Sequence, residues 1–363
     1  MNVLAPPPRE IRVLVVDDSL VIRGLISRHL KDVAGVSVVG SASDGAKALD
    51  HVRGGGIDVV ILDIEMPVMD GIAALPEMLK IDPALVVIMA STLTTRNAAI
   101  SLRALRLGAA DYIPKPSATS EIYGENDFRR ELLEKVLHLG HRRHGAKVAA
   151  SSSPAQTQGG KIPPAISLRA RTAQRPKVLA VASSTGGPNA LALFFKNLDK
   201  DIALPIFVTQ HMPPTFTALL AEHLGRESGW LVKEAAAGDA VLPGRVLIAP
   251  GDRHLLVQAD GVKIDAGPRE NYCRPAADPM LRSLAALYRG QVLSVVLTGM
   301  GQDGLKGCEA VVAAGGTVMA QDEGSSVIWG MPGAVATAGL CTVIGTPDDL
   351  ARAASRFVKT GSY

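Results

Sequence analysis

Val178-Leu-Ala-Val-Ala-Ser-Ser-Thr-Gly-Gly-Pro188 is the stretch that decides the fold of this sequence. The small and β-branched apolar residues of 178–182 predict a buried strand, and the apolar spacing of 190–195 predicts a helix. Two serines, a threonine and two glycines separate them. A strand, a tight turn and a helix start in this order place a hydroxyl and free backbone N–H groups at the strand's carboxyl end. The turn can therefore hold a nucleophile or a phosphate, or simply cap the helix.

The composition is that of an ordinary folded protein. The chain has 363 residues, of which 47% are hydrophobic and 20% charged, enough for two domains with full cores. No run of about 18 apolar residues occurs, so we expect a cytoplasmic protein that is not inserted in a membrane. The net charge of +3 is too small to indicate nucleic-acid binding by itself. Cys273, Cys308 and Cys341 share no short spacing, and we expect reduced core residues.

A basic segment of low complexity divides the chain. No Asp or Glu occurs between Lys135 and Leu198, and residues 149–160 are too polar to bury much apolar surface. The pattern predicts three parts: a first domain over 11–130, a flexible basic linker over 141–175 and a second domain over 176–360. The basic charge of the linker could contact an acidic surface, although a solvated tether is the simpler interpretation.

Strand and helix patterns alternate through the first domain. The expected strands are 11–16, 36–42, 58–62, 85–90 and 110–114, with helices between them and a last helix near 128–139. Five such units predict an α/β fold with a doubly wound parallel sheet, whose ligands bind at the carboxyl ends of the strands.

Charged and hydroxyl residues follow four of these strands. Asp17 and Asp18 follow the first strand, Asp63 the third, Thr92 the fourth and Lys115 the fifth. Three carboxylates brought together repel one another unless a cation is present, and oxygen donors beside a phosphate suit Mg²⁺. One such Asp could be a turn or cap residue. The full set predicts a magnesium site at which a carboxylate could be phosphorylated.

Three segments resemble the signature segments of response-regulator receiver domains. They are Val15-Val-Asp-Asp-Ser19, Leu62-Asp-Ile-Glu-Met-Pro-Val-Met-Asp-Gly71 and Asp111-Tyr-Ile-Pro-Lys-Pro116. The resemblance covers about residues 11–130 and implies a flavodoxin-like fold.

The same resemblance implies a role for each polar residue at the strand ends. Asp63 would accept the phosphoryl group and Lys115 would pair with it. Thr92 corresponds to the hydroxyl residue that hydrogen-bonds the new phosphoryl oxygen, with the neighbouring Ser91 as the alternative. Mg²⁺ would be held by Asp17, Asp18, Asp63 and the backbone carbonyl of Glu65.

The second domain is predicted to be α/β as well. Apolar runs at 178–182, 205–210, 292–297 and 317–321 indicate strands of a second doubly wound parallel sheet. The runs 246–249, 255–258 and 262–265, with Asp260-Gly261 as a hairpin turn, are expected to form a small antiparallel insertion.

Polar residues follow three of the parallel strands of this second sheet. Ser183 and Ser184 follow the first strand, His211 the second, and Asp303 lies in the loop after the third. Because these loops share one edge of the sheet, a hydroxyl, an imidazole and a carboxylate would converge. The imidazole, with a pKa near ~6.5, can remove a serine proton, and the carboxylate orients it. Two rival partners also lie in polar loops: His254 and Asp322.

Five segments, in this order, resemble the catalytic domain of chemotaxis protein-glutamate methylesterases, the CheB family. They are Ser184-Thr-Gly-Gly187, Gln210-His-Met-Pro-Pro214, Ala249-Pro-Gly-Asp252, Leu297-Thr-Gly-Met-Gly-Gln-Asp-Gly304 and Gly330-Met-Pro-Gly333. The resemblance implies that Ser184 is the nucleophile, His211 the base, Asp303 its orienting acid and the Met300 backbone N–H an oxyanion donor. The family usually has Gly-Ala before the serine, where this sequence has Ala182-Ser183.

The resemblance also implies a substrate, partners and a mode of control. The enzyme would demethylate glutamate methyl esters, and deamidate certain glutamines, on methyl-accepting chemoreceptors. A histidine kinase of the CheA type would phosphorylate the receiver, which lies over the esterase cleft until then. Mg²⁺ would serve the receiver only, and the esterase would need no cofactor.

Two other classes of output domain remain as alternatives. Ser184-Thr-Gly-Gly187 could cradle the phosphate of a nucleotide, but no Gly-x-Gly-x-x-Gly or Gly-Lys-Ser/Thr motif accompanies it. A DNA-binding domain would show a compact helix-turn-helix pattern and a basic recognition helix, and the sequence shows neither. We therefore expect no nucleic-acid partner.

Overall fold

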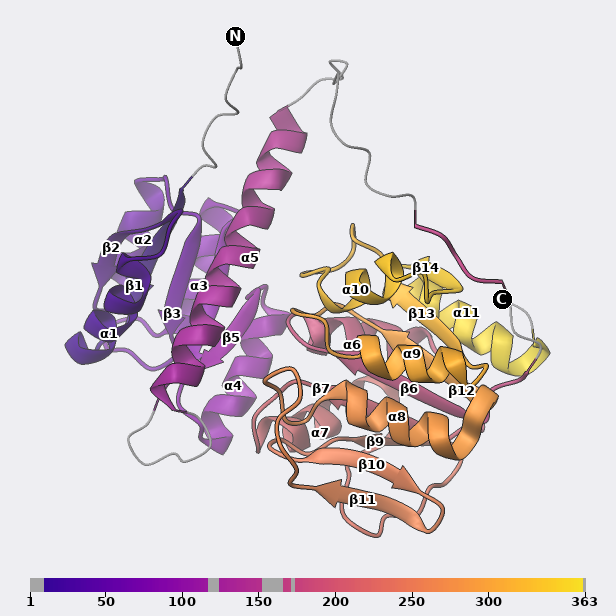
Figure 1. Cartoon of the computed structure of the whole chain (residues 1–363). Coiled ribbons are helices and arrows are strands. Elements are labelled where there is room, and N and C mark those ends of the chain that lie inside the picture. Colours follow the sequence, from indigo (N-terminus) through magenta and orange to yellow (C-terminus); the bar gives the residue numbers. More distant parts are fainter. Residues whose placement is uncertain (1–9, 117–123, 152–165, 171–173, 362–363) are drawn as a thin grey trace. The chain divides into compact units, whose positions relative to one another are not determined.

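The chain forms two compact units, which divide near residue 160. The computed structural model describes residues 10–116, 124–151, 166–170 and 174–361. Each unit is a parallel sheet with helices on both faces (Figure 1). The predicted α/β class with two doubly wound domains is confirmed. None of the helices in the described ranges combines the length and the apolar character that crossing a bilayer requires.

The first unit contains a parallel sheet of five strands in the order β2-β1-β3-β4-β5. This order places β1 and β3 side by side at its centre, with β4 next to β3. Each strand lies within two residues of its predicted range. The strands are β1 (Ile11–Val16), β2 (Val36–Ala42), β3 (Val59–Asp63), β4 (Val86–Ser91) and β5 (Asp111–Pro114).

Short polar side chains start the helices of this unit directly after the strands. The side chains of Ser19, Asp44, Asp70 and Thr94 each accept the backbone N–H three residues on, as N-caps do. Helix α1 packs beside α5, while α2, α3 and α4 pack in a row. The helices are α1 (Leu20–Lys31), α2 (Gly45–Arg53), α3 (Gly71–Ile81), α4 (Thr95–Arg106) and α5 (Glu125–Ser151).

Helix α5 is longer than the sequence predicts, since it ends at Ser151 instead of near residue 139. Arg143 is buried and forms ion pairs with Asp58, at 3.2 Å, and Asp82, at 2.5 Å. The first part of the range 141–175 is therefore helical and not a flexible linker. A buried cation needs carboxylate partners, and Arg143 has two. Residues 152–165 and 171–173 of that range lie outside the described residues, and the three predicted domain boundaries stay predictions.

The second unit contains a parallel sheet of seven strands in the order β14-β13-β12-β6-β7-β9-β8. Strand β6, which carries the opening stretch, lies between β12 and β7. The strands are β6 (Val178–Ser183), β7 (Ile206–Gln210), β8 (Leu231–Glu234), β9 (Arg245–Ile248), β12 (Val292–Val296), β13 (Thr317–Gln321) and β14 (Val343–Gly345).

The antiparallel insertion is smaller than predicted. Strands β10 (His254–Gln258) and β11 (Gly261–Asp265) form the expected antiparallel hairpin. The prediction is wrong for the run 246–249, because β9 pairs in parallel with both β7 and β8 of the main sheet. A short apolar run has the same pattern in either setting, and its partner β8, a half-exposed edge strand, gives no strong apolar signal.

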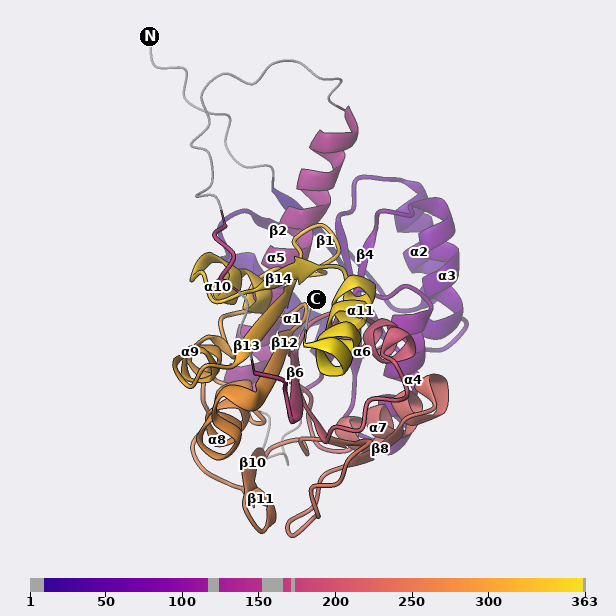
Figure 2. The same cartoon turned by 90° about the vertical axis from the view of Figure 1, so that its right-hand side faces the viewer.

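Helices cover both faces of the second sheet. Figure 2 shows α8, α9 and α10 on one side of β6, β12 and β13, and α6, α7 and α11 on the other. A 3₁₀ turn, Arg289–Gln291, leads into β12. The helices are α6 (Gly187–Asn197), α7 (Phe216–Ser228), α8 (Ala277–Tyr288), α9 (Leu305–Ala313), α10 (Met331–Thr337) and α11 (Pro347–Thr360).

Candidate functional site

Three carboxylates gather at the carboxyl ends of β1 and β3 in the first unit. One oxygen from each of Asp17, Asp18 and Asp63 lies within 4.8 Å of the others. Asp17 and Asp63 are buried, and Asp18 is exposed. The Lys115 ammonium after β5 reaches into the cluster, 2.6 Å from Asp17 and 2.7 Å from Asp63. The structure brings together the four charged side chains that the sequence placed at this edge.

The Asp63 carboxyl is poorly stabilised as an anion. Its pKa is raised to about 6, because burial and the neighbouring Asp17 raise it more than Lys115 and the Ile64 backbone N–H lower it. Three carboxylates with a single ammonium leave an excess of negative charge, and all the donors are oxygens. This donor set fits Mg²⁺, which binds through a few carboxylates and keeps water or phosphate in its remaining positions.

The hydroxyl residues after β4 differ in their surroundings. Ser91 is buried and its Oγ accepts a hydrogen bond from Ser101 in α4 at 3.1 Å. Thr92 is exposed, and its Oγ1 accepts from the Asn97 amide at 2.7 Å. A hydroxyl that responds to a new phosphoryl group must be free to turn toward it. The exposure of Thr92 therefore favours it over Ser91 for that role.

The segment after Asp63 is fixed by a close backbone approach. The Gly71 N–H donates to the Ile64 carbonyl at 3.0 Å, and a Cβ at Gly71 would lie only 2.0 Å from the Asp63 carbonyl oxygen. Glycine is therefore required there. The Glu65 carboxylate points outward to Arg96, at 3.7 Å. The metal contact predicted for Glu65 is through its backbone carbonyl, which this ion pair does not involve.

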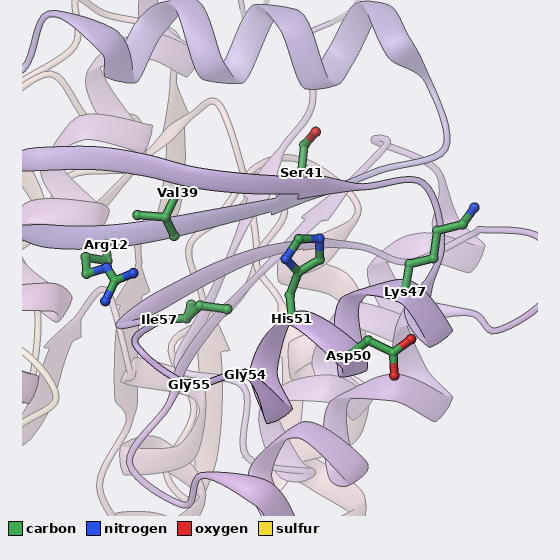
Figure 3. Close-up of a pocket in the computed structure, with 9 residues that line it drawn as sticks. All are labelled: Arg12, Val39, Ser41, Lys47, Asp50, His51, Gly54, Gly55 and Ile57. Carbon is green, nitrogen blue, oxygen red and sulfur yellow. The ribbon is translucent and has the colours of Figure 1, made fainter.

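A separate hollow of about 580 Å³ opens elsewhere on the first unit (Figure 3). It is lined by Arg12 at the start of β1 and by the loop before β3, so most of it lies toward the amino ends of the strands. It is therefore no part of the carboxylate cluster. Its lining residues are Arg12, Val39, Ser41, Lys47, Asp50, His51, Gly54, Gly55 and Ile57.

The two serines after β6 have different environments in the second unit. Ser183 is fully buried and its hydroxyl donates to the Gln210 side chain at 2.7 Å. Ser184 is partly exposed, and its backbone is held on both sides: its N–H donates to the Thr298 carbonyl at 3.0 Å, and its carbonyl accepts from Gln210 at 2.9 Å. The hydroxyl of Ser184 is therefore the one that a substrate can reach.

The strand order explains why the polar residues of the second unit meet. Strand β6 pairs with β12 on one side and β7 on the other, so the loops that carry Asp303, Ser184 and His211 are neighbours. The His211 Nε2 lies 2.7 Å from an Asp303 carboxylate oxygen. The imidazole and carboxylate predicted to work together are in contact.

The Asp303 carboxylate is stabilised as an anion by further hydrogen bonds. It accepts from the backbone N–H groups of Ala277, at 2.6 Å, and Asp278, at 3.2 Å, at the start of α8, and from the Asn271 amide at 2.9 Å. Burial alone would raise the pKa of Asp303, but these donors and His211 outweigh it and hold the pKa below its ordinary value. An ionised carboxylate can orient a base and stabilise its protonated form.

Burial and two neighbouring residues act on the pKa of His211 in opposite directions. Burial lowers its pKa, whereas the Cys273 sulfur and the Asp303 carboxylate raise it, and the balance lies above the ordinary value. Since Asp303 occupies Nε2, the nitrogen left to accept a serine proton is Nδ1. Among the described residues, the Ser184 hydroxyl makes no hydrogen bond to His211. Catalytic hydrogen bonds are often long before substrate binds.

The rival residues have structural roles. Both ring nitrogens of His254 are engaged, one with the Pro268 carbonyl at 2.9 Å and the other with the Ala276 N–H at 3.2 Å. Asp322 accepts the Ser325 N–H at 2.8 Å in a tight turn. Neither contacts the hydroxyl or the imidazole described above, so both alternatives lose their support.

The loop after β12 lies against Ser184. A Cβ on Gly299 would stand 2.9 Å from the Cβ of Ser184, so the two backbones touch. The Gly299 carbonyl accepts from the N–H groups of Gly330, at 3.0 Å, and Met331, at 2.8 Å, which fixes this loop. Met300 is the next residue of the chain after this contact. This arrangement supports Met300 as an oxyanion donor.

Sequence reasoning missed two residues of this site. Asn271, with φ +51°, bridges the carboxylates of Asp303 and Asp278. The predicted core position of Cys273 is wrong, because this residue is only partly buried and its sulfur lies 3.4 Å from His211 Nδ1. The expectation is right for Cys308 and Cys341, which are buried. No spacing or motif in the sequence places the loop before α8 against His211.

Comparison with known proteins gives the same division of the chain. Residues 179–354 match the family described as CheB methylesterase, and residues 13–125 match the response regulator receiver domain. A protein of Paramagnetospirillum magneticum named protein-glutamate methylesterase/protein-glutamine glutaminase 1 is 52% identical, and the match covers 94% of each chain. A protein of Azospirillum brasilense with the name protein-glutamate methylesterase/protein-glutamine glutaminase is 50% identical, over 92% of this chain and 89% of its own.

Two crystal structures from Thermotoga maritima match one unit each. The CheB methylesterase catalytic domain is 40% identical and covers 51% of this chain and 100% of its own, with a TM-score of 0.49. The response regulator domain of CheB is 42% identical and covers 36% of this chain and 95% of its own, with a TM-score of 0.32.

Proposed function

The chain belongs to the CheB methylesterase family, and we propose that it hydrolyses glutamate methyl esters on chemoreceptors with Ser184 as the nucleophile, under the control of Asp63. One observation supports the assignment of residues most strongly. A partly exposed serine lies at the end of β6, between the loop that carries the base and the loop that carries its carboxylate. Serine hydrolases need a hydroxyl, an imidazole and a carboxylate close together, and an α/β sheet can supply them at one edge.

The proposed reaction follows from the positions of Ser184, His211 and Asp303. The Ser184 hydroxyl attacks the ester carbonyl while His211 takes its proton at Nδ1, because Asp303 occupies Nε2. The negative oxygen of the tetrahedral intermediate binds the Met300 backbone N–H. His211 then protonates methoxide, and methanol leaves. In the second half, His211 takes a proton from water, which attacks the acyl-enzyme. Ser184 leaves with that proton, and the glutamate carboxylate is released.

Deamidation of glutamine uses the same groups. The acyl-enzyme is identical, and only the leaving group changes, from methanol to ammonia. His211 protonates the departing nitrogen with the proton that it took from Ser184. The enzyme is thus a protein-glutamate methylesterase and a protein-glutamine glutaminase.

The first unit supplies the control. Asp63 receives a phosphoryl group, Lys115 pairs with the new charge, and the exposed Thr92 hydroxyl can turn to hydrogen-bond it. Mg²⁺ would be held by Asp17, Asp18, Asp63 and the Glu65 carbonyl, and would neutralise the charge that a phosphodonor brings. We propose a histidine kinase of the CheA type as the donor.

The setting of the reaction is part of the proposal. Chemoreceptors carry their methylated glutamates on cytoplasmic helices, so the enzyme would act in the cytoplasm. The three cysteines are free, which agrees with a reducing compartment. The esterase half is proposed to work without a metal, since a hydroxyl, an imidazole and a carboxylate suffice for acyl transfer.

Methanol release from receptor membranes tests the proposal. Membranes that contain methyl-labelled chemoreceptors are incubated with the full chain, and volatile methanol is counted. We expect release by the wild type and none above background with Ser184→Ala. Equal release by both proteins would remove Ser184 from the reaction. The absence of any release by phosphorylated wild-type protein would contradict the proposed substrate.

A further inference from the structure

The base of the proposed esterase has a partner that the reaction does not use. The two ring nitrogens of His211 are both engaged: Nε2 with Asp303 at 2.7 Å, and Nδ1 with the sulfur of Cys273 at 3.4 Å. A thiol hydrogen bond of this length is normal for sulfur. The sulfur therefore occupies the one nitrogen that has to accept the Ser184 proton.

Cys273 differs from the other two cysteines of the chain. Burial raises the pKa of the Cys341 thiol to about 12 and that of Cys308 further still, so both stay protonated and shielded. Cys273 is partly exposed and touches an imidazole that can take its proton. A thiol needs access and a nearby base to react with electrophiles, and of the three only Cys273 has both.

The backbone of the loop holds this sulfur in place. Glu270 and Cys273 exchange two backbone hydrogen bonds, at 2.8 and 3.1 Å, around a tight turn. The two residues inside the turn, Asn271 and Tyr272, both have positive φ, +51° and +63°, which side-chain-bearing residues rarely adopt. The Arg282 guanidinium secures Glu270 through two hydrogen bonds. Such a strained turn persists only where its surroundings determine it.

We propose that Cys273 is a positioning residue of the esterase, whose thiol holds Nδ1 of His211 in the resting site until the Ser184 hydroxyl replaces it there. The inference rests on the proposed esterase function. It has a chemical consequence. A group attached to the Cys273 sulfur would stand between His211 and Ser184, and the base could not take the serine proton.

Methyl methanethiosulfonate is a small probe for this arrangement. The Cys273 sulfur attacks the methylthio sulfur and forms a disulfide bond, while the bond to the sulfonyl sulfur breaks and methanesulfinate leaves with the electron pair. The thiol proton passes to His211 and then to solvent. Dithiothreitol reverses the reaction by thiol–disulfide exchange. The adduct adds only a methylthio group, so its effect reports on the immediate surroundings of the sulfur.

The first experiment uses the full chain without substitution. We expect one methylthio group, located on Cys273 by mass spectrometry, and a loss of methanol release of at least tenfold that dithiothreitol restores. Cys341→Ala serves as the matched control and should lose activity to the reagent as the wild type does. An adduct on Cys273 that leaves turnover unchanged would overturn the proposal, as would inactivation that follows labelling of a buried cysteine.

Two substitutions separate positioning from simple packing. Cys273→Ala removes the partner of Nδ1, and we expect a several-fold lower kcat with KM unchanged, whereas Cys273→Ser keeps a small donor and should recover most of the loss. In the described part of the chain, the titratable groups in contact with His211 are Cys273 and Asp303, and Asn271 joins Asp303 to Asp278. Since Cys273 raises the pKa of His211, the acidic limb of kcat/KM should move to lower pH in Cys273→Ala. A wild-type kcat and pH profile in this variant would contradict the proposal.

A third measurement does not depend on ester turnover. If the contact with His211 assists the thiol, His211→Ala should slow the labelling of Cys273 at neutral pH. Unchanged labelling would refute the contact itself. Failure of the proposed function would look different, because labelling would then still depend on His211 although no methanol was released.

Discussion

Asp63 and Asp303 are the same residue type in corresponding places, yet they are prepared for opposite tasks. Each lies at the carboxyl edge of a parallel sheet, and each is buried. Burial and Asp17 raise the pKa of Asp63 to about 6, whereas hydrogen bonds from His211 and the start of α8 lower that of Asp303. The Asp63 anion is poorly stabilised, which favours its reaction or the binding of a cation. The Asp303 anion is well stabilised and orients His211.

The contrast shows that a shared fold does not determine the chemistry of the carboxylates at its edge. A doubly wound sheet gathers polar loops at one edge, but the number of donors around each carboxylate sets its chemistry. Asp63 faces two further carboxylates and one ammonium. Asp303 faces backbone N–H groups, an amide and an imidazole. The first arrangement favours phosphoryl transfer with a metal ion, and the second favours proton transfer.

The largest expected effect concerns the nucleophile that Asp303 supports. Ser184→Ala should lower methanol release by about 10⁵-fold, since the reacting hydroxyl is lost and the neighbouring Ser183 is buried. Ser183→Ala should lower it by less than about tenfold, because that buried hydroxyl only donates to Gln210. The turnover of both variants with methylated receptors measures the difference. The reverse order would move the reaction to Ser183.

Removing the negative charge of Asp303 should have the next largest effect on turnover. In Asp303→Asn an amide replaces a carboxylate that accepts four hydrogen bonds, so His211 loses both its orientation and the anion that stabilises its protonated form. We expect turnover to fall by about 10³- to 10⁴-fold. The double variant with Ser184→Ala should be no slower than Ser184→Ala alone. Additive losses would show that the two residues act separately.

Phosphorylation of Asp63 should depend on a metal ion. With Mg²⁺ and a small phosphodonor, Asp63 should take up one hydroxylamine-labile phosphoryl group, detected by mass spectrometry. EDTA should prevent this, because the carboxylates of Asp17 and Asp18 repel a dianionic donor unless a cation is present. Asp63→Asn is the control and should not be labelled. Labelling that persists in EDTA would contradict the proposed magnesium site.

The smallest expected effect is on stability. Because the folded-state pKa of Asp63 is raised, its ionised form destabilises the fold, and this penalty grows as the pH rises from about 4 through about 6. Asp63→Asn cannot ionise and should be more stable than the wild type by about 1–2 kcal/mol at pH 7.5 without Mg²⁺. The advantage should disappear below about pH 4. Chemical denaturation at both pH values measures it, and a less stable variant at pH 7.5 would mean that the Lys115 pairs dominate.

The sequence predicts most of the fold and the meeting of the charged groups, for a physical reason. Period-two and helical apolar patterns, with capping residues such as Ser19 and Asp70, are local signals, and parallel strands bring their carboxyl ends together. What it could not predict depends on contacts between distant segments. Strand β9 joined the main sheet, Arg143 found Asp58 and Asp82, and the turn before α8 brought Cys273 to His211. No local pattern encodes these contacts.

Phosphorylation of Asp63 is proposed to control ester hydrolysis at the site of Ser184, His211 and Asp303. One comparison of rates tests this most directly. Methanol release by the full chain is measured with and without a phosphodonor in Mg²⁺, beside Asp63→Asn and a fragment that begins at Pro176. We predict that phosphorylation accelerates the wild type by about 5- to 150-fold, as a coupling free energy of 1–3 kcal/mol allows. The variant and the fragment should not respond, and the fragment should exceed the unphosphorylated full chain. An unchanged rate in wild-type protein whose Asp63 is demonstrably phosphorylated would contradict the account.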